Sequence, residues 1–283
     1  MFKKIVIASD FSLISDQLLE DITQFKDKGL EEVIILHVLP EGKKGERLKE
    51  KSLRKLEKRE KLLVDEGIRV RAILKKGVPA FHIKEVTEEE GGDLVMIGTR
   101  GHNPLRDFFI GSTALTYIRI ATKPTLVIKE KKRKRDMPRR GFFTRPIVPV
   151  DFSKYSDNVI KWTLKQDISN YVEEYLLLHV WAVRDDVRDD KESKAKWKEY
   201  ARQRLEDMKK DYGSRKVKAE VFLRGGFPIT QVKELVEDKG ASMVIMATRG
   251  MGHVIELPIG SIAEGIVREV ELPILLLPRV SLI

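Results

Sequence analysis

Apolar residues occur along this chain in two alternating patterns, short β-branched runs and longer stretches with helical spacing. The run at 5–8 predicts a buried strand, and the stretch at 12–28 predicts the helix that follows it. Further strands are predicted at 33–38, 70–74, 94–97 and 125–128, and further helices at 46–66, 79–90 and 112–121. β-branched runs separated by helices are typical of a parallel sheet covered on both faces. The pattern therefore predicts an α/β fold with right-handed crossovers.

The whole pattern occurs twice. The Asp-Phe-Ser segment that begins at Asp10 returns 141 residues later at Asp151, and Gly111 returns 149 residues later as Gly260. Most of the extra residues of the second copy lie between His179 and Gly226, in a long charged helix and its flanking loops. The repeat predicts two tandem domains, 1–130 and 144–283, joined by a basic linker at 131–143.

A glycine signature follows the fourth strand of each copy. Gly98 and Gly101 precede Gly111 and Ser112, and the second copy has Ala247 and Gly250 before Gly260 and Ser261; nine residues separate the inner glycines in both. Glycines let the backbone approach a phosphate closely, and a helix N-terminus adds N–H donors and positive dipole. The signature favours a phosphate-binding loop. The structural alternative is that the glycines serve only the turn and the serines are plain N-caps.

Composition narrows the class of protein. The chain has no cysteine, which excludes disulfides, thiolate chemistry and cysteine-ligated metal centres. No apolar run approaches the roughly 20 residues that span a bilayer, and the chain enters its first strand without a signal-peptide pattern. These features predict a cytoplasmic protein with no membrane partner. Charged residues make up 35% of the chain, a share also found in proteins from hot environments.

The net charge of +10 is concentrated in one segment. Between Lys129 and Arg145, nine Lys or Arg residues outnumber two acids. Such a run is either an electrostatic tether for an anionic partner or a solvated linker kept extended by self-repulsion. The linker interpretation is favoured and nucleic acid is not, because the only aromatics are Phe142 and Phe143, which we expect to pack onto the second domain.

Parallel sheets of this kind bind ligands at the carboxyl ends of their strands, where the strand order reverses. We therefore expect the ends of the first and fourth strands to meet at one crevice in each domain. These ends are Ser9, Asp10, Ile97 and Gly98 in the first copy and Val150, Asp151, Met246 and Ala247 in the second. The alternative for the two aspartates is that they merely begin a turn.

Taken together, these motifs resemble the universal stress protein family. The resemblance rests on the Gly-x2-Gly-x9-Gly-Ser pattern, the Asp-Phe-Ser segment and a Leu-His-Val segment around His37, and it covers both copies apart from the linker. It implies two doubly wound domains, each with a five-stranded parallel sheet in the order 3-2-1-4-5. It also implies that domains pair through their last strands, which gives an internal pseudo-dimer and a homodimer of tandem chains.

The resemblance to the ATP-binding branch of the family also implies a nucleotide site in each copy. In the first copy Asp10 and Val38 would contact the adenosine of ATP or AMP. Its phosphates would be surrounded by Gly98, Gly101, Gly111, Ser112 and Thr113. The corresponding residues of the second copy are Asp151, Val180, Gly250, Gly260, Ser261 and Ile262.

Ala247 departs from this pattern. It costs about 1 kcal/mol or more if the position needs a positive φ, and less if only close backbone approach is needed. We therefore expect the first site to bind better than the second.

Binding and signalling fit the sequence better than catalysis. The loop is not a Walker A motif, no base is evident, and His37 and His179 read as buried strand histidines without catalytic work. No compact carboxylate cluster marks a metal site, so any Mg2+ would arrive with the nucleotide. In this interpretation the nucleotide orders the loop at 102–110, and an unknown protein partner reads its state. The alternatives are a nucleotide-independent scaffold that uses the basic linker, and a slow ATPase.

Overall fold

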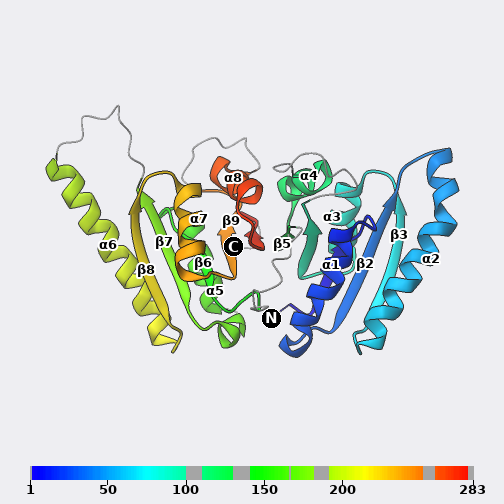
Figure 1. Ribbon diagram of the computed structural model, residues 1–283, viewed down its shortest axis with the longest axis horizontal. Coiled ribbons are helices and arrows are strands. Elements are labelled where there is room, and N and C mark those ends of the chain that lie inside the picture. Colours follow the sequence, from blue (N-terminus) through cyan, green and yellow to red (C-terminus); the bar gives the residue numbers. More distant parts are fainter. Residues whose placement is uncertain are drawn as a thin grey trace. The chain divides into compact units, whose positions relative to one another are not determined.

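The computed structural model describes residues 2–99, 110–129, 141–165, 167–181, 191–250 and 259–279 (Figure 1). Contacts divide the chain into two compact units. The first comprises Met1–Met137 with Pro273–Ser281, and the second comprises Pro138–Leu272 with Leu282–Ile283. Among the described residues, no helix has both the length and the apolar character needed to cross a membrane.

The first unit is built on a parallel sheet with the strand order β3-β2-β1-β4-β5. This order confirms the prediction made from the family resemblance. The strands are β1 (Lys4–Ala8), β2 (Glu32–Leu39), β3 (Val70–Lys76), β4 (Leu94–Gly98) and β5 (Thr125–Ile128). By its contacts β10 (Ile274–Leu277) belongs to this unit, where it pairs antiparallel with β5 and places Leu275 opposite Leu126.

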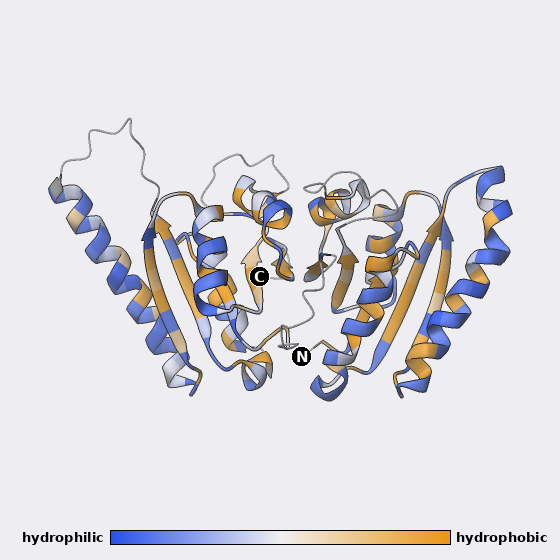
Figure 2. Cartoon of the chain, in the orientation of Figure 1, coloured by the Kyte–Doolittle hydropathy of each residue, from blue (hydrophilic) through white to orange (hydrophobic). Residues whose placement is uncertain are grey.

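Helices cover the first sheet because its strands are apolar on both faces. Ile5, Val6 and Ile7 of β1 are all fully buried, and Figure 2 shows the strands as hydrophobic. The helix α2 (Lys43–Asp65) packs on β2 and β3, and α3 (Pro79–Glu89) packs on β1, β2 and α4 (Ser112–Ile120).

The helix predicted at 12–28 is divided in the structure. It forms the α-helix α1 (Leu13–Asp21), which continues as the 3-10 helix η1 (Ile22–Lys28). Gly29 ends the segment in the left-handed region with φ of 84°, which glycine adopts without steric cost. Hydrophobic spacing does not separate the two helix types, because both bury residues such as Leu18 and Phe25 on one side.

The second unit repeats four strands of this arrangement in the order β8-β7-β6-β9, which corresponds to β3-β2-β1-β4 of the first unit. Its strands are β6 (Pro146–Pro149), β7 (Tyr175–Trp181), β8 (Ala219–Gly225) and β9 (Met243–Ala247). Its helices are α5 (Lys154–Lys165), the 3-10 helix η2 (Asp167–Tyr171), α6 (Lys191–Ser214), α7 (Pro228–Lys239) and α8 (Ser261–Glu269). Phe142 and Phe143 are buried, and the carbonyl of Phe142 accepts a hydrogen bond from Ser242, as expected from packing onto this unit.

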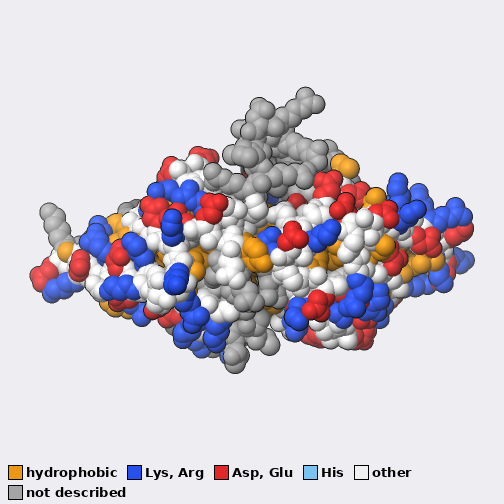
Figure 3. All heavy atoms as spheres, turned by 90° about the horizontal axis from the view of Figure 1, so that it is seen from below, with side chains coloured by type: hydrophobic (Ala, Val, Ile, Leu, Met, Phe, Trp, Pro, Cys, Tyr) orange, Lys and Arg blue, Asp and Glu red, His pale blue; other side chains and the backbone are white. Residues whose placement is uncertain are grey.

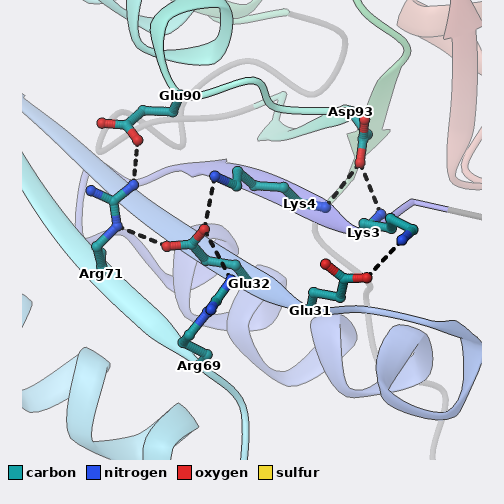
Figure 4. A network of polar contacts seen from close by, with 8 residues as sticks. All are labelled: Lys3, Lys4, Glu31, Glu32, Arg69, Arg71, Glu90 and Asp93. Atoms are coloured by element: carbon teal, nitrogen blue, oxygen red, sulfur yellow. Dashed lines mark hydrogen bonds and ion pairs between the residues drawn. The ribbon is translucent and has the colours of Figure 1, made fainter.

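A charged network ties the N-terminal ends of the first three strands together (Figure 4). Its centre is Glu32, whose side chain is 8% exposed and forms ion pairs with Lys4 at 2.9 Å and Arg71 at 2.7 Å. Hydrogen bonding to Lys4, and then to Arg71, holds the pKa of Glu32 below its usual value. The network lies at the opposite end of the strands from the predicted crevice. On the rest of the surface, charges of both signs are interspersed over the face shown in Figure 3.

Candidate functional site

A cavity of about 200 Å³ lies at the carboxyl ends of β1, β2 and β4 in the first unit. It also touches the beginnings of α1, α3 and α4. The cavity brings together the predicted first-copy residues Ser9, Asp10, Val38, Ile97, Gly98, Gly111, Ser112 and Thr113. Gly101, the remaining predicted residue, and most of the predicted loop, 102–109, lie outside the described residues.

The turn after β1 is held by the side chain of Asp10. Its Oδ1 atom accepts hydrogen bonds from the backbone N–H of Ser12, at 2.9 Å, and from the Ser12 hydroxyl. Asp151 repeats the first of these contacts with the N–H of Ser153, at 3.0 Å. The turn interpretation of the aspartates is therefore correct, but it does not compete with a ligand role, because Asp10 also lines the cavity.

Backbone contacts close the loop in front of α4. The N–H of Gly111 donates to the carbonyl of Thr99 at 2.6 Å, and the N–H of Gly260 donates to Thr248 at 2.8 Å. A Cβ on Gly111 would lie 3.2 Å from that Thr99 oxygen, which is tighter than an ordinary contact. The close approach of the backbone to itself is thus one reason for glycine at this position.

The N-cap interpretation of the two signature serines is wrong by one residue. Gly111 and Gly260 occupy the N-cap positions, and Ser112 and Ser261 are the first residues of α4 and α8. Neither glycine can offer a side-chain capping bond. The first-turn N–H groups, which lack intrahelical partners in any α-helix, therefore have no N-cap side chain to satisfy them in α4 or α8, and this is the arrangement that anions use.

Ala247 is accommodated without backbone strain. Gly98 is not among the residues with positive φ, and neither is Ala247. A Cβ on Gly98 would instead lie 2.7 Å from the side chain of Ile14. Residue 14 corresponds to Tyr155 in the second copy, so both partners of this contact differ between the copies. The cost of about 1 kcal/mol that a positive φ would impose on Ala247 therefore does not apply.

The second copy places its predicted residues at the equivalent strand and helix ends. Val150 and Asp151 follow β6, Val180 lies in β7, Met246 and Ala247 end β9, and Gly260 precedes Ser261 and Ile262 at the start of α8. Gly250 lies directly against Asp151, because a Cβ on Gly250 would overlap the Asp151 carboxylate. A residue with a side chain at this position would require the Asp151 carboxylate to shift.

A phenylalanine and a histidine stack beside each aspartate. Phe11 lies 4.0 Å from His37 between ring centroids, and Phe152 lies 4.3 Å from His179. Both phenylalanines have positive φ, 62° and 59°. Sequence reasoning did not identify this pair. The sequence does repeat a phenylalanine directly after each aspartate, and this repetition was the available signal. In the structure, a positive φ at a bulky residue is unusual and indicates that surrounding contacts impose the conformation of the turn.

Each histidine is held by the carbonyl at the end of the neighbouring strand. Nδ1 of His37 lies 2.7 Å from the carbonyl of Ser9, and Nδ1 of His179 lies 2.6 Å from the carbonyl of Val150. Burial lowers the pKa of both imidazoles. The described residues contain no group of three His, Cys, Asp or Glu side chains arranged to hold a metal ion.

The family comparison covers both copies. The model of the universal stress protein family matches residues 1–129 and 143–278. A universal stress protein of Methanocaldococcus jannaschii is 31% identical over 157 residues, which are 46% of this chain and 97% of the relative. The universal stress protein YxiE of Bacillus subtilis is 26% identical over 46% of this chain and all of the relative. These relatives therefore have about the length of one domain.

A solved structure matches the full tandem arrangement. The crystal structure of a universal stress protein from Archaeoglobus fulgidus aligns with a TM-score of 0.76 and covers 98% of each chain, at 22% sequence identity. At this identity the likeness shows the fold.

Proposed function

Because the chain belongs to the universal stress protein family, we propose that it is a stress-response protein that binds adenine nucleotide and passes the nucleotide state to a partner protein. The observation that carries the proposal is the convergence of three strand ends and the α4 N-terminus on one cavity. Strand ends of a doubly wound sheet and a helix N-terminus are where such folds bind nucleotides.

In the first domain, Asp10 and Val38 would hold the adenosine, and the first turn of α4 would hold the phosphates. Ser112 is exposed and Thr113 is half-buried, and both line the cavity. Their N–H groups lie in the turn that lacks intrahelical partners. Any Mg2+ would arrive on the phosphates of the nucleotide, whose oxygens it prefers as ligands.

We propose that the second domain binds nucleotide too, with a different affinity. Its loop is closed by the same Gly260 to Thr248 hydrogen bond, and its α8 begins in the same way. The differences lie at Ala247 and Tyr155, which replace Gly98 and Ile14. They change the shape of the wall beside the strand end while leaving the helix N-terminus in place.

The test is to denature freshly purified protein, identify any released nucleotide by chromatography and count it per chain. The variants are Gly111→Val and Gly260→Val, measured separately, with added ATP titrated by calorimetry. A Val side chain at 111 would crowd Thr99, so we expect that site to lose binding. Gly213→Val is the matched control, because nothing lies within 4 Å of the Cβ position at Gly213. A wild-type chain that releases no nucleotide and gives no heat with ATP would refute the proposal.

A further inference from the structure

We propose that Nε2 of His37 accepts a hydrogen bond from the nucleoside in the first domain and thereby helps to select it. The inference rests on the proposed nucleotide binding and adds to it a specificity-determining residue. Two observations support the inference. The imidazole of His37 is held in place beside the cavity, and the equivalent ring of the second domain, His179, is buried.

The backbone fixes the tautomer of His37. A carbonyl oxygen only accepts hydrogen bonds, so the 2.7 Å contact with Ser9 requires that Nδ1 carries the hydrogen. In the neutral ring Nε2 is then a hydrogen-bond acceptor. Burial lowers the pKa of His37, which keeps the ring neutral near pH 7.

The ring is also fixed in orientation. Phe11 packs on His37 with 32° between the ring planes. Lys55 and Arg59 of α2 lie over the Phe11 ring, 4.9 and 4.7 Å from its centroid. His37 lines the cavity together with Ser9 and Asp10. Among the described residues, the His37 ring makes no hydrogen bond other than the Nδ1 contact with Ser9. In our proposal Nε2 is the oriented acceptor that the cavity wall offers to a ligand.

The second domain keeps the same ring but covers it. His179 makes the same backbone contact and stacks on Phe152, yet it is 3% exposed and its Nε2 is buried without a partner. Trp197 of α6 lies 5.1 Å from the His179 ring, and Tyr200 lies edge-on to Phe152. The Trp197 indole packs beside a ring whose Nε2 is already buried. The two domains thus differ in how exposed this histidine is, and the difference does not depend on Ala247.

The ligand group that meets a neutral acceptor must be a hydrogen-bond donor. Adenosine has donors in its ribose hydroxyls and its exocyclic amine, whereas inosine has a carbonyl in place of the amine and carries its base N–H at N1 instead. Losing one hydrogen bond to an uncharged group weakens binding by roughly three- to tenfold. Because the expected loss depends on the donor, analogues that lack one donor each can identify it.

The experiment measures by calorimetry the affinities of ATP, 2′-deoxy-ATP, 3′-deoxy-ATP and ITP for the full-length chain. The variants are His37→Phe, which keeps the stack on Phe11, and His37→Asn, whose amide can still donate to Ser9. His179→Phe is the matched control in the second domain. We expect both His37 variants to bind ATP roughly three- to tenfold more weakly than wild type. In His179→Phe, the affinity of the stronger site should equal that of wild type. For the one analogue that lacks the donor, wild type and the His37 variants should bind equally.

Three results would overturn the inference. If His37→Phe and His37→Asn bind ATP as tightly as wild type, the proposed function stands and the role of His37 falls. If they weaken all four nucleotides by the same factor, His37 acts through packing and accepts no hydrogen bond. A wild-type chain that binds no adenine nucleotide would refute the proposed function and this inference together. Circular dichroism identifies a variant that fails to fold, and the other variant then decides.

Discussion

Phe11 and Phe152 hold a backbone conformation that is costly for any residue with a side chain. Their φ angles of 62° and 59° lie in the left-handed region, at a cost of roughly 1–2 kcal/mol. The aspartate that precedes each of them accepts a hydrogen bond from the serine that follows. Stacking on the histidine adds a second constraint. The strain is therefore held by contacts on both sides of the turn.

This strain predicts an inverted order of two variants. Phe11→Gly and Phe11→Ala remove the same ring, but only glycine adopts positive φ without cost. We expect the glycine variant to be the more stable of the two by roughly 1 kcal/mol, measured by urea unfolding. At an ordinary position the order is the reverse. Equal stability, or a more stable alanine variant, would contradict strain at this turn.

A second prediction at the residue scale concerns pH. Burial lowers the pKa of His179 below its ordinary value of 6.5, although nearby Asp151 opposes the shift. Below pH 6.5 the unfolded chain therefore binds more protons than the folded chain, and stability falls as the pH is lowered through this range. Between pH 7.5 and 5.5, the thermal stability of His179→Phe should therefore fall less than that of wild type. An unchanged pH profile would show that His179 is not the group responsible.

At the scale of elements, the network in Figure 4 fastens β1, β2 and β3 at one end. Glu32 is buried between cations, whereas its neighbour Glu31 pairs with Lys3 at the exposed surface, with both side chains more than half exposed. An exposed pair gains little from its charge, but a buried carboxylate with several donors contributes more. The two adjacent glutamates therefore form a matched comparison.

We expect Glu32→Gln to lower the free energy of unfolding by about 1–2 kcal/mol, and Glu31→Gln to change it too little to resolve. The pKa of Glu32 is lowered, so its contribution is present above the ordinary value of 4.5 and is lost as the pH falls below it. Chemical denaturation at pH 7 and pH 3.5 checks both points. The difference between wild type and Glu32→Gln should be smaller at pH 3.5 than at pH 7, because protonation of Glu32 begins to remove its contribution below pH 4.5. A difference that stays the same as the pH is lowered from 7 to 3.5 would contradict the ionic origin.

The strands were predictable from the sequence because buried β-branched runs and the repeat leave few alternatives, whereas their order followed from the family resemblance. The eight described first-copy site residues also meet, since strand ends in a doubly wound sheet converge. Three features were not predictable. The split of 12–28 depends on hydrogen-bond spacing, the N-cap at Gly111 depends on loop closure to Thr99, and the Phe11 stack depends on a positive φ. Each of these is set by contacts between segments and leaves no periodic pattern.

At the scale of the whole molecule, β10 completes the environment of β5. All four residues of β10 are buried, and the strand pairs with β5 within the first unit. A fragment that ends at 129 lacks this strand and presents an apolar edge. Uncovered edges of this kind pair with other strands. Relatives with about the length of one domain show that a single domain is a natural unit of this family.

We therefore expect the fragment 1–129 to self-associate through β5, with a concentration-dependent mass in light scattering after gel filtration. A synthetic peptide spanning 272–279 should compete for the edge and lower that mass. The same peptide with Leu275→Pro is the control, because proline removes an N–H that antiparallel pairing uses and should leave the mass unchanged. A fragment that is monomeric at every concentration would show that the edge of β5 does not pair by itself. In that case the pairing seen with β10 would depend on the rest of the chain.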